Sequence, residues 1–117
     1  MNNYKDLVVW KKAVNFAVLI YKETECFPQT EVYGITSQIR RAASSIAANI
    51  AEGAGRNSNK EFIHLLSIAL GSIYEVETFL YIAKEIEYIA EENFNKLLLV
   101  TAELNKMLRA LQKSKNI

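Results

Sequence analysis

The scarcity of glycine and proline most constrains how this chain can fold. Its 117 residues include one proline, Pro28, and four glycines. These two residues are the main local signals for chain breaks, so their scarcity indicates a few long elements. Apolar residues recur at steps of three and four through four segments, which is typical of helices that bury one face. The sequence therefore predicts an all-α protein.

The breaks between these segments have identifiable causes. The four predicted helices span about residues 6–26, 31–53, 59–87 and 90–113 of one domain. Asp6 is a suitable N-cap for the first helix, and Pro28 disfavours helix at the residue before it. Glycines end the second helix, and Ser58 or Asn59 caps the third. The break near residue 89 depends only on acidic residues that suit a first turn. Short connections predict an antiparallel, up-down-up-down four-helix bundle.

Each predicted helix has one apolar stripe that we expect to form the core. These stripes are Leu7, Trp10, Val14, Ala17 and Tyr21; Ile35, Ile39, Ala43, Ile46 and Ile50; Phe62, Leu66, Ala69, Ile73, Val76 and Leu80; and Phe94, Leu97, Val100, Leu104, Leu108 and Leu111. Reflection about the breaks places Ala47 level with Trp10, and Ala43 level with Val14. Large side chains then meet alanine on the second helix, which allows this helix to pack closely.

The overall composition limits the possible partners and compartments. Lys and Arg number 14 against 13 Asp and Glu, so nucleic-acid binding would need a local patch. The single Cys26 excludes an internal disulfide and fits a reducing compartment. No stretch approaches about 20 apolar residues, and the N-terminal sequence does not resemble a secretion signal. We therefore expect a cytoplasmic protein without a membrane span.

Polar residues form a second stripe on the second and third helices. The stripe on the second helix is Gln38, Arg41, Ser45, Asn49 and Glu52, and that on the third is His64, Ser67, Gly71, Glu75 and Thr78. One interpretation is two solvated faces, and another is ligand binding. A third is a half-buried network in which Arg40 or Arg41 pairs with Glu75, since the planar guanidinium can make two hydrogen bonds to one carboxylate. The candidate residues of this network or subunit interface are Gln38, Arg40, Arg41, Ser45, Asn49, Glu52, Gly71, Ser72 and Glu75.

Surplus apolar residues on two helices support association with a second copy of the chain. On the first helix they are Val8, Val9, Phe16, Val18, Leu19 and Ile20, and on the third they are Ile63, Ile68, Tyr74, Phe79, Tyr81 and Ile82. One small bundle cannot bury all of these side chains inside. Large exposed apolar patches commonly mark protein contacts. Small residues of the polar stripe would admit a helix from the second copy.

No catalytic residue, metal site or cofactor is predicted. Glu61 and His64 have the spacing found in di-metal bundles, but such sites need two Glu-x-x-His pairs and the chain has one His. One His and one Cys also exclude a zinc cluster. Arg56 and His64 resemble the Arg and His pair of some small helical ribonucleases, although seven residues intervene. The GAGR segment lacks the Lys-Ser/Thr continuation of a phosphate loop.

Basic residues gather near one end of the predicted bundle. The candidate nucleic-acid-binding residues are Lys11, Lys12, Arg56, Lys60, Arg109 and Lys113. Ordinary solvated charges are the alternative interpretation. Oligomerisation would repeat such a patch as a basic ring, and the partner would then be structured RNA or a nucleic-acid enzyme.

Three segments make the chain recognisable: DLVVWKKAVNF, FPQTEVYGITSQIRRAASSIAANIAEGAGR and KEFIHLLSIALGSIYEVET. They resemble the bacterial proteins encoded in intervening sequences of 23S ribosomal RNA genes. The resemblance implies a four-helix bundle, a ring-shaped homopentamer and no enzymatic activity. A related, strongly basic branch is the accessory protein of diversity-generating retroelements, which binds nucleic acid and reverse transcriptase; the near-neutral chain departs from it. The positions that match the family pattern are Trp10, Gln38, Arg40, Arg41, Asn49, Glu52, Gly53, Gly71, Ser72 and Glu75.

Overall fold

The protein folds into four long helices. The computed structural model describes residues 3–116. The helices are α1 (Val8–Glu23), α2 (Ile35–Ala54), α3 (Asn59–Glu85) and α4 (Glu91–Lys115). Three short 3-10 turns, η1 (Tyr4–Asp6), η2 (Thr24–Cys26) and η3 (Gln29–Glu31), complete the described part of the chain, which contains no strand. The predicted all-α fold is confirmed.

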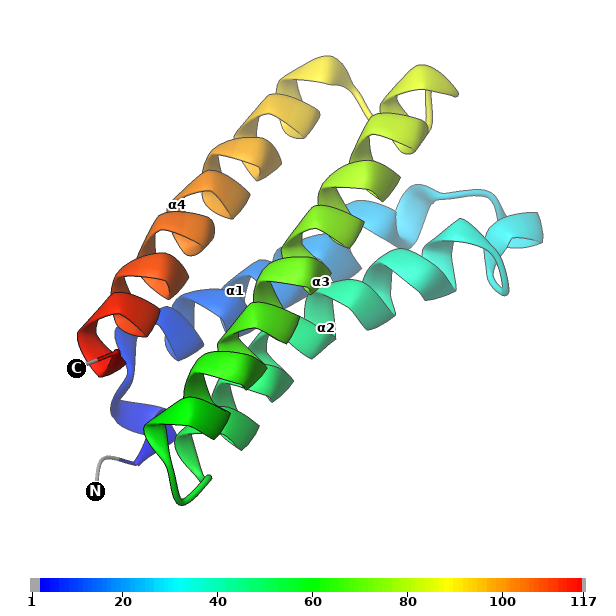
Figure 1. The fold of residues 1–117 in the computed structure, drawn as a ribbon. Coiled ribbons are helices and arrows are strands. Elements are labelled where there is room, and N and C mark those ends of the chain that lie inside the picture. Colours follow the sequence, from blue (N-terminus) through cyan, green and yellow to red (C-terminus); the bar gives the residue numbers. More distant parts are fainter. Residues whose placement is uncertain (1–2, 117) are drawn as a thin grey trace.

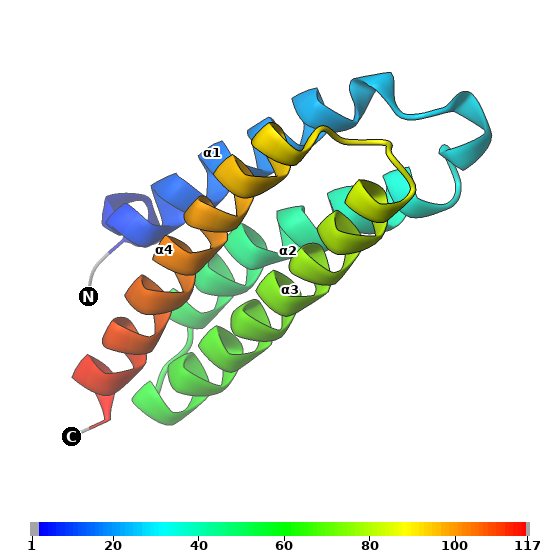
Figure 2. The same cartoon turned by 90° about the horizontal axis from the view of Figure 1, so that it is seen from above.

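The helices occupy the four corners of an elongated bundle, with α1 and α3 each lying beside α2 and α4 (Figures 1 and 2). The bundle measures 45 × 24 × 20 Å. Cross-helix hydrogen bonds show the helix directions: late Gln112 of α4 meets early Ser67 of α3, while early Asn93 of α4 meets late Glu23 of α1. Helix α4 therefore runs antiparallel to α3 and to α1, and the chain course in Figure 1 shows α2 running back alongside α1. Both termini and the α2–α3 turn lie at one end of the bundle (Figure 1).

The first two helices begin later than predicted. Asp6 does not cap α1, because it belongs to η1 and Leu7 precedes the helix instead. Predicted helix 31–53 also starts late: residue 31 ends η3, and α2 begins after Gly34. Ser58 caps α3 as predicted, since its hydroxyl accepts a hydrogen bond of 3.2 Å from the Glu61 amide.

The core predictions succeed for α2 and α3 and fail for α1. All six predicted core residues of α3 are buried, and so are those of α2 apart from the half-buried Ile35. On α4, Thr101 is buried whereas the predicted Val100 and Leu111 are half-buried. The buried residues of α1 are Val9, Ala13, Phe16 and Ile20. The predicted α1 stripe, of which Tyr21 is exposed, therefore lies at the edge of the core.

The predicted heights are also wrong by about one helical turn between α1 and α2. Arg40, three residues before Ala43, bonds to Tyr21 and Thr24, so Ala43 lies nearer the end of α1 than Val14, with which the sequence placed it level. The late start of α2 explains this offset. Because α2 begins at Ile35, each of its residues lies closer to the C-terminal end of α1 than predicted.

Helix α3 is long and apolar enough to cross a membrane by length and composition alone, and 44% of its most apolar 18-residue stretch is buried within the bundle. Its apolar residues form a large part of the bundle core.

Candidate functional site

Three of the candidate network residues form a small hydrogen-bonded cluster where α2 packs on α3. The hydroxyl groups of Ser45 and Ser72 share a hydrogen bond across the two helices. The Asn49 amide donates to the Ser45 carbonyl at 2.8 Å. Buried polar groups need such partners to offset their lost hydration. This cluster therefore belongs to the α2–α3 contact within one chain.

Arg40 joins α2 to the end of α1. Its Nε donates to the Thr24 hydroxyl at 2.8 Å, and its Nη2 donates to the Tyr21 carbonyl at 3.1 Å. The guanidinium also stacks on the Tyr21 ring, 4.7 Å from its centroid. The predicted pair between Arg40 and Glu75 is wrong for the single chain, because Arg40 points towards α1 whereas Glu75 belongs to α3.

The remaining stripe residues are exposed. Gln38, Arg41, Gly71 and Glu75 all lie on the surface. Within residues 3–116, neither Arg41 nor Glu75 makes an ion pair, so the half-buried network predicted around them does not form in one chain. Glu52 instead pairs with Arg56 at 2.6 Å, one turn further along the chain. The alternative interpretation, an interface between copies, stays a prediction.

An apolar groove of about 490 Å³ runs between α1 and α2. It is lined by Val14, Ala17, Val18, Tyr21, Lys22, Ser44 and Ala47. The α2 side of the groove is made of small side chains, which leave room for another helix to approach. A second apolar hollow of about 360 Å³ lies between the start of α1 and the end of α4. Most of the α1 residues of the groove belong to the predicted core stripe, so the groove was not predicted.

The surplus apolar residues separate into buried and exposed sets. Those that the bundle buries are Val9, Phe16 and Ile20. Those that stay exposed are Val8, Val18, Leu19, Ile68, Tyr74, Tyr81 and Ile82. Leu99 on α4 was not predicted and is the most exposed leucine among the described residues, at 73%. One chain thus leaves apolar surface uncovered on several sides, and the expectation of such a surplus is met in part.

Three of the six basic candidates are already bonded within the chain. Lys12 pairs with Glu103 at 3.1 Å. Arg56 is held by Glu52 and, at 3.4 Å, by Glu61, and the Glu52 hydrogen bond raises the pKa of Arg56. The other bonded candidate, Arg109, lies on α4.

The Arg109 interaction was not foreseen from the sequence. Its Nη2 donates to the Tyr74 hydroxyl oxygen at 2.8 Å, and the Asn105 amide donates to the same oxygen at 3.1 Å. Asn105, and then Arg109, lower the pKa of Tyr74 because both donors stabilise the phenolate. Tyr74 and Arg109 lie on different helices, so no local spacing in the sequence links the two residues.

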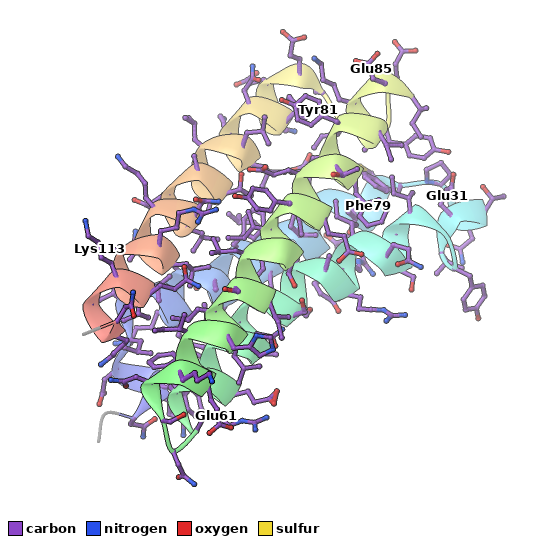
Figure 3. The ribbon with its side chains drawn as sticks, in the orientation of Figure 1. Glu31, Glu61, Phe79, Tyr81, Glu85 and Lys113 are labelled. Atoms are coloured by element: carbon purple, nitrogen blue, oxygen red, sulfur yellow. The ribbon has the colours of Figure 1, made fainter. Side chains whose placement is uncertain are left out.

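The other three candidates, Lys11, Lys60 and Lys113, are exposed and make no ion pair within the described residues. Lys113 lies near the same end of the bundle as Glu61 and points away from the helices (Figure 3). A pocket of about 270 Å³ at this end is lined by Arg56 and by Lys115, and Lys115 is not among the predicted candidates. The basic end is therefore smaller than predicted, and acidic residues interrupt it.

The described residues contain no group of three or more His, Cys, Asp and Glu side chains placed to hold a metal ion. His64 is exposed on α3. Arg56, its partner in the ribonuclease-like pair, is hydrogen-bonded to the carboxylates of Glu52 and Glu61.

Comparison with known proteins identifies relatives. The family model described as 23S rRNA-intervening sequence protein matches residues 5–110. A crystal structure of a protein with unknown function, from the S23 ribosomal protein family of Bacteroides thetaiotaomicron VPI-5482, is 34% identical in sequence. The match has a TM-score of 0.81 and covers 91% of this chain and 99% of that chain. No curated protein shows significant similarity.

Proposed function

The chain belongs to the 23S rRNA-intervening sequence protein family, and from this premise we propose that it is a non-enzymatic scaffold that assembles with copies of itself. The observation that carries the proposal is the apolar groove between α1 and α2, which is left open in one chain. Apolar surface of this kind is stabilised when another protein surface covers it. The proposed assembly is a closed ring, and the homopentamer implied by the family resemblance is its expected size.

Light scattering coupled to size exclusion tests this proposal directly. The expected mass is about five times the 13.3 kDa of one chain. A mass of one chain at tens of micromolar would reject self-association, and a stable dimer would reject the ring. A cytoplasmic location is part of the proposal, because the thiol of Cys26 is exposed and free.

A second candidate function is binding of structured RNA at the basic end. Lys11, Lys60 and Lys113 support it, because they are exposed and without ion pairs in the described chain. A ring would repeat these lysines once in every subunit. Binding through phosphate contacts weakens steeply as salt rises. Fluorescence anisotropy with structured ribosomal RNA should then show a strong salt dependence, and absence of binding at low salt would remove this candidate.

The proposal assigns no catalysis to the chain. A ribonuclease would need His64 as its acid or base and Arg56 as its phosphate ligand. Glu52 and Glu61 hold that guanidinium, which argues against such a role. A His64→Ala variant tests the point: any cleavage by the preparation should be unchanged, whereas loss of cleavage would make the protein a nuclease.

A further inference from the structure

We propose that the α1–α2 groove of one copy receives the edge of α3 from the next copy. Ile68, Gly71 and Glu75 of the incoming helix lie against Ala47, Ser44 and Arg41, respectively, of the receiving helix. The inference rests on the proposed self-association and adds which two surfaces meet. The two surfaces differ, so the contact is of the head-to-tail kind that builds rings or filaments.

The receiving surface combines small side chains with a basic border. Ser44 and Ala47 provide the α2 side of the groove, and Val18 and Tyr21 stand exposed on the α1 side. Lys22 lies at the end of the groove, and Arg41 lies one turn before Ser44 on α2. Small residues allow two helix backbones to approach closely, and the border leaves positive charge beside an apolar contact.

The incoming surface is apolar and acidic. Ile68, Glu75 and Ile82 follow one another at seven-residue intervals on α3, so they share one face of the helix. The two isoleucines are 42% and 44% exposed, although removing such a side chain from water is favourable. Glu75 lies between them and has no ion pair within residues 3–116. This face therefore offers a negative charge flanked by apolar side chains.

Gly71 gives independent support for a close approach on this face. A Cβ atom built at Gly71 meets nothing within 4 Å, and its φ is not positive. Neither the packing nor the backbone of its own chain thus requires glycine there. Glycine inside a helix is destabilising relative to alanine. A neighbouring helix that passes over Gly71 explains why this position lacks a side chain.

The spacing of the two surfaces matches. Gly71 lies three residues after Ile68 and four before Glu75, while Ser44 lies three residues from both Ala47 and Arg41. These steps are each close to one helical turn of about 5.4 Å. An antiparallel contact thus sets apolar against apolar, small against small and Glu75 against Arg41. Lys22 adds a second positive charge near that carboxylate.

The positions of the two surfaces favour a closed ring. The groove opens on the α1–α2 side of the bundle, and the α3 edge faces the neighbouring α2–α3 side. When the two contact surfaces lie on adjacent sides of the bundle, each added copy is rotated about the long axis of the bundle, and the assembly can close into a ring. Contact surfaces on opposite sides would build a straight filament. In such a ring the symmetry axis is parallel to the long axis of each bundle, and the α2 helices lie nearest the centre of the ring. An antiparallel match of α2 with the next α3 follows from this geometry.

Charge reversal tests the pairing. The single variants Arg41→Glu and Glu75→Arg each place like charges across the contact and should reduce the assembled fraction at least tenfold, measured by light scattering. The double variant should recover assembly, because the opposite charges are restored in reverse order. Failure of the double variant to recover, or unchanged assembly of both single variants, would overturn the inference. An unassembled unmodified protein would reject self-association itself.

Substitution of Gly71 tests the close approach without disturbing the core. Gly71→Gln should fold at least as stably as the unmodified chain by circular dichroism, yet lose assembly, because its side chain occupies the space of the incoming backbone. Ala102→Gln, at an exposed position of α4, is the matched control and should assemble normally. Full assembly of Gly71→Gln would overturn the inference while the proposed self-association remained intact. Loss in both variants would equally reject the assigned surface.

Discussion

Ala43 and Ala47 are one helical turn apart on α2 but have different surroundings. Ala43 is completely buried, whereas Ala47 lines the open groove. Ala43→Leu should therefore overpack the core and lower the free energy of unfolding by about 1–3 kcal/mol. Ala47→Leu should cost less than half as much, because its added atoms can extend into the groove. Urea unfolding at one protein concentration measures both, and equal losses would contradict the structure.

Two tyrosines should ionise on opposite sides of the ordinary tyrosine range. Asn105 and Arg109 lower the pKa of Tyr74, whereas a hydrogen bond of 2.8 Å to the Glu31 carboxylate raises the pKa of Tyr88. Tyr88 therefore stabilises the fold below the pKa of an unfolded tyrosine, and this contribution is lost as pH rises through its folded pKa. The contribution of Tyr74 is fully present above the pKa of an unfolded tyrosine and is lost as pH falls through its lower folded pKa.

Ultraviolet absorbance titration distinguishes the two tyrosines. Tyr74→Phe should remove the earliest part of the ionisation curve, and Tyr88→Phe should remove its latest part. Arg109→Gln is a matched variant that keeps Tyr74 and should move the early ionisation to higher pH, because it replaces the positive charge. An early part that survives Tyr74→Phe would show that another tyrosine ionises first.

Among the elements, α3 ends in a way that the sequence signals did not reveal. Glu87 has a φ of 64°, which is the left-handed region normally taken by glycine. The Tyr88 amide donates to the Ala83 carbonyl at 2.8 Å, so the helix closes with a Schellman-type hydrogen bond. Glu87→Gly should raise the free energy of unfolding by about 1 kcal/mol, since it removes the steric conflict of a side chain there. Thermal unfolding measures the gain, and a loss of stability would refute it.

A comparison of the predicted and observed core residues explains which helices could be predicted. The core residues of α2 were predictable because its apolar residues fall in one stripe with polar residues opposite. The core stripe of α3 was also identified, although α3 carries further apolar residues, such as Ile68 and Ile82, outside that stripe. Helix α1 has apolar residues on most sides, including Val8 and Leu19, so two stripes about one residue apart fit the periodicity equally well. Only packing against the other helices selects Val9 and Phe16 as buried. The lesson is that periodicity fixes a helix but not its rotation when both faces are apolar.

The candidate site was harder to predict than the fold, because it depends on relative height. The residue types around Arg41 and Glu75 were recognised, but their pairing within one chain was inferred from reflected helix ends. The 3-10 turn η3 and Gly34 delay the start of α2 to Ile35 and shift its residues by about one turn. Arg40 then reaches Thr24 on the α1 side. A groove that depends on such heights cannot be read from local spacing.

The whole molecule should become more stable as its concentration rises. The single chain leaves Val18, Tyr21, Ile68 and Ile82 exposed on the two surfaces that we propose to meet. Association that covers them favours the folded state by mass action, since unfolded chains do not present these surfaces. Each tenfold rise in concentration then adds up to ~1.4 kcal/mol per chain, which corresponds to roughly 5 °C in Tm for a domain of this size.

This dependence separates a functional assembly from weak, incidental association. Calorimetric scans over a hundredfold range of concentration should show a rising Tm for the unmodified protein and a constant Tm for Arg41→Glu, which keeps the core but reverses one charge at the contact. At high dilution the two proteins should converge, because Arg41 makes no ion pair within the described chain. A constant Tm for both proteins would mean that the exposed apolar surface is not covered by copies of the chain. Parallel rises would place the contact away from α2.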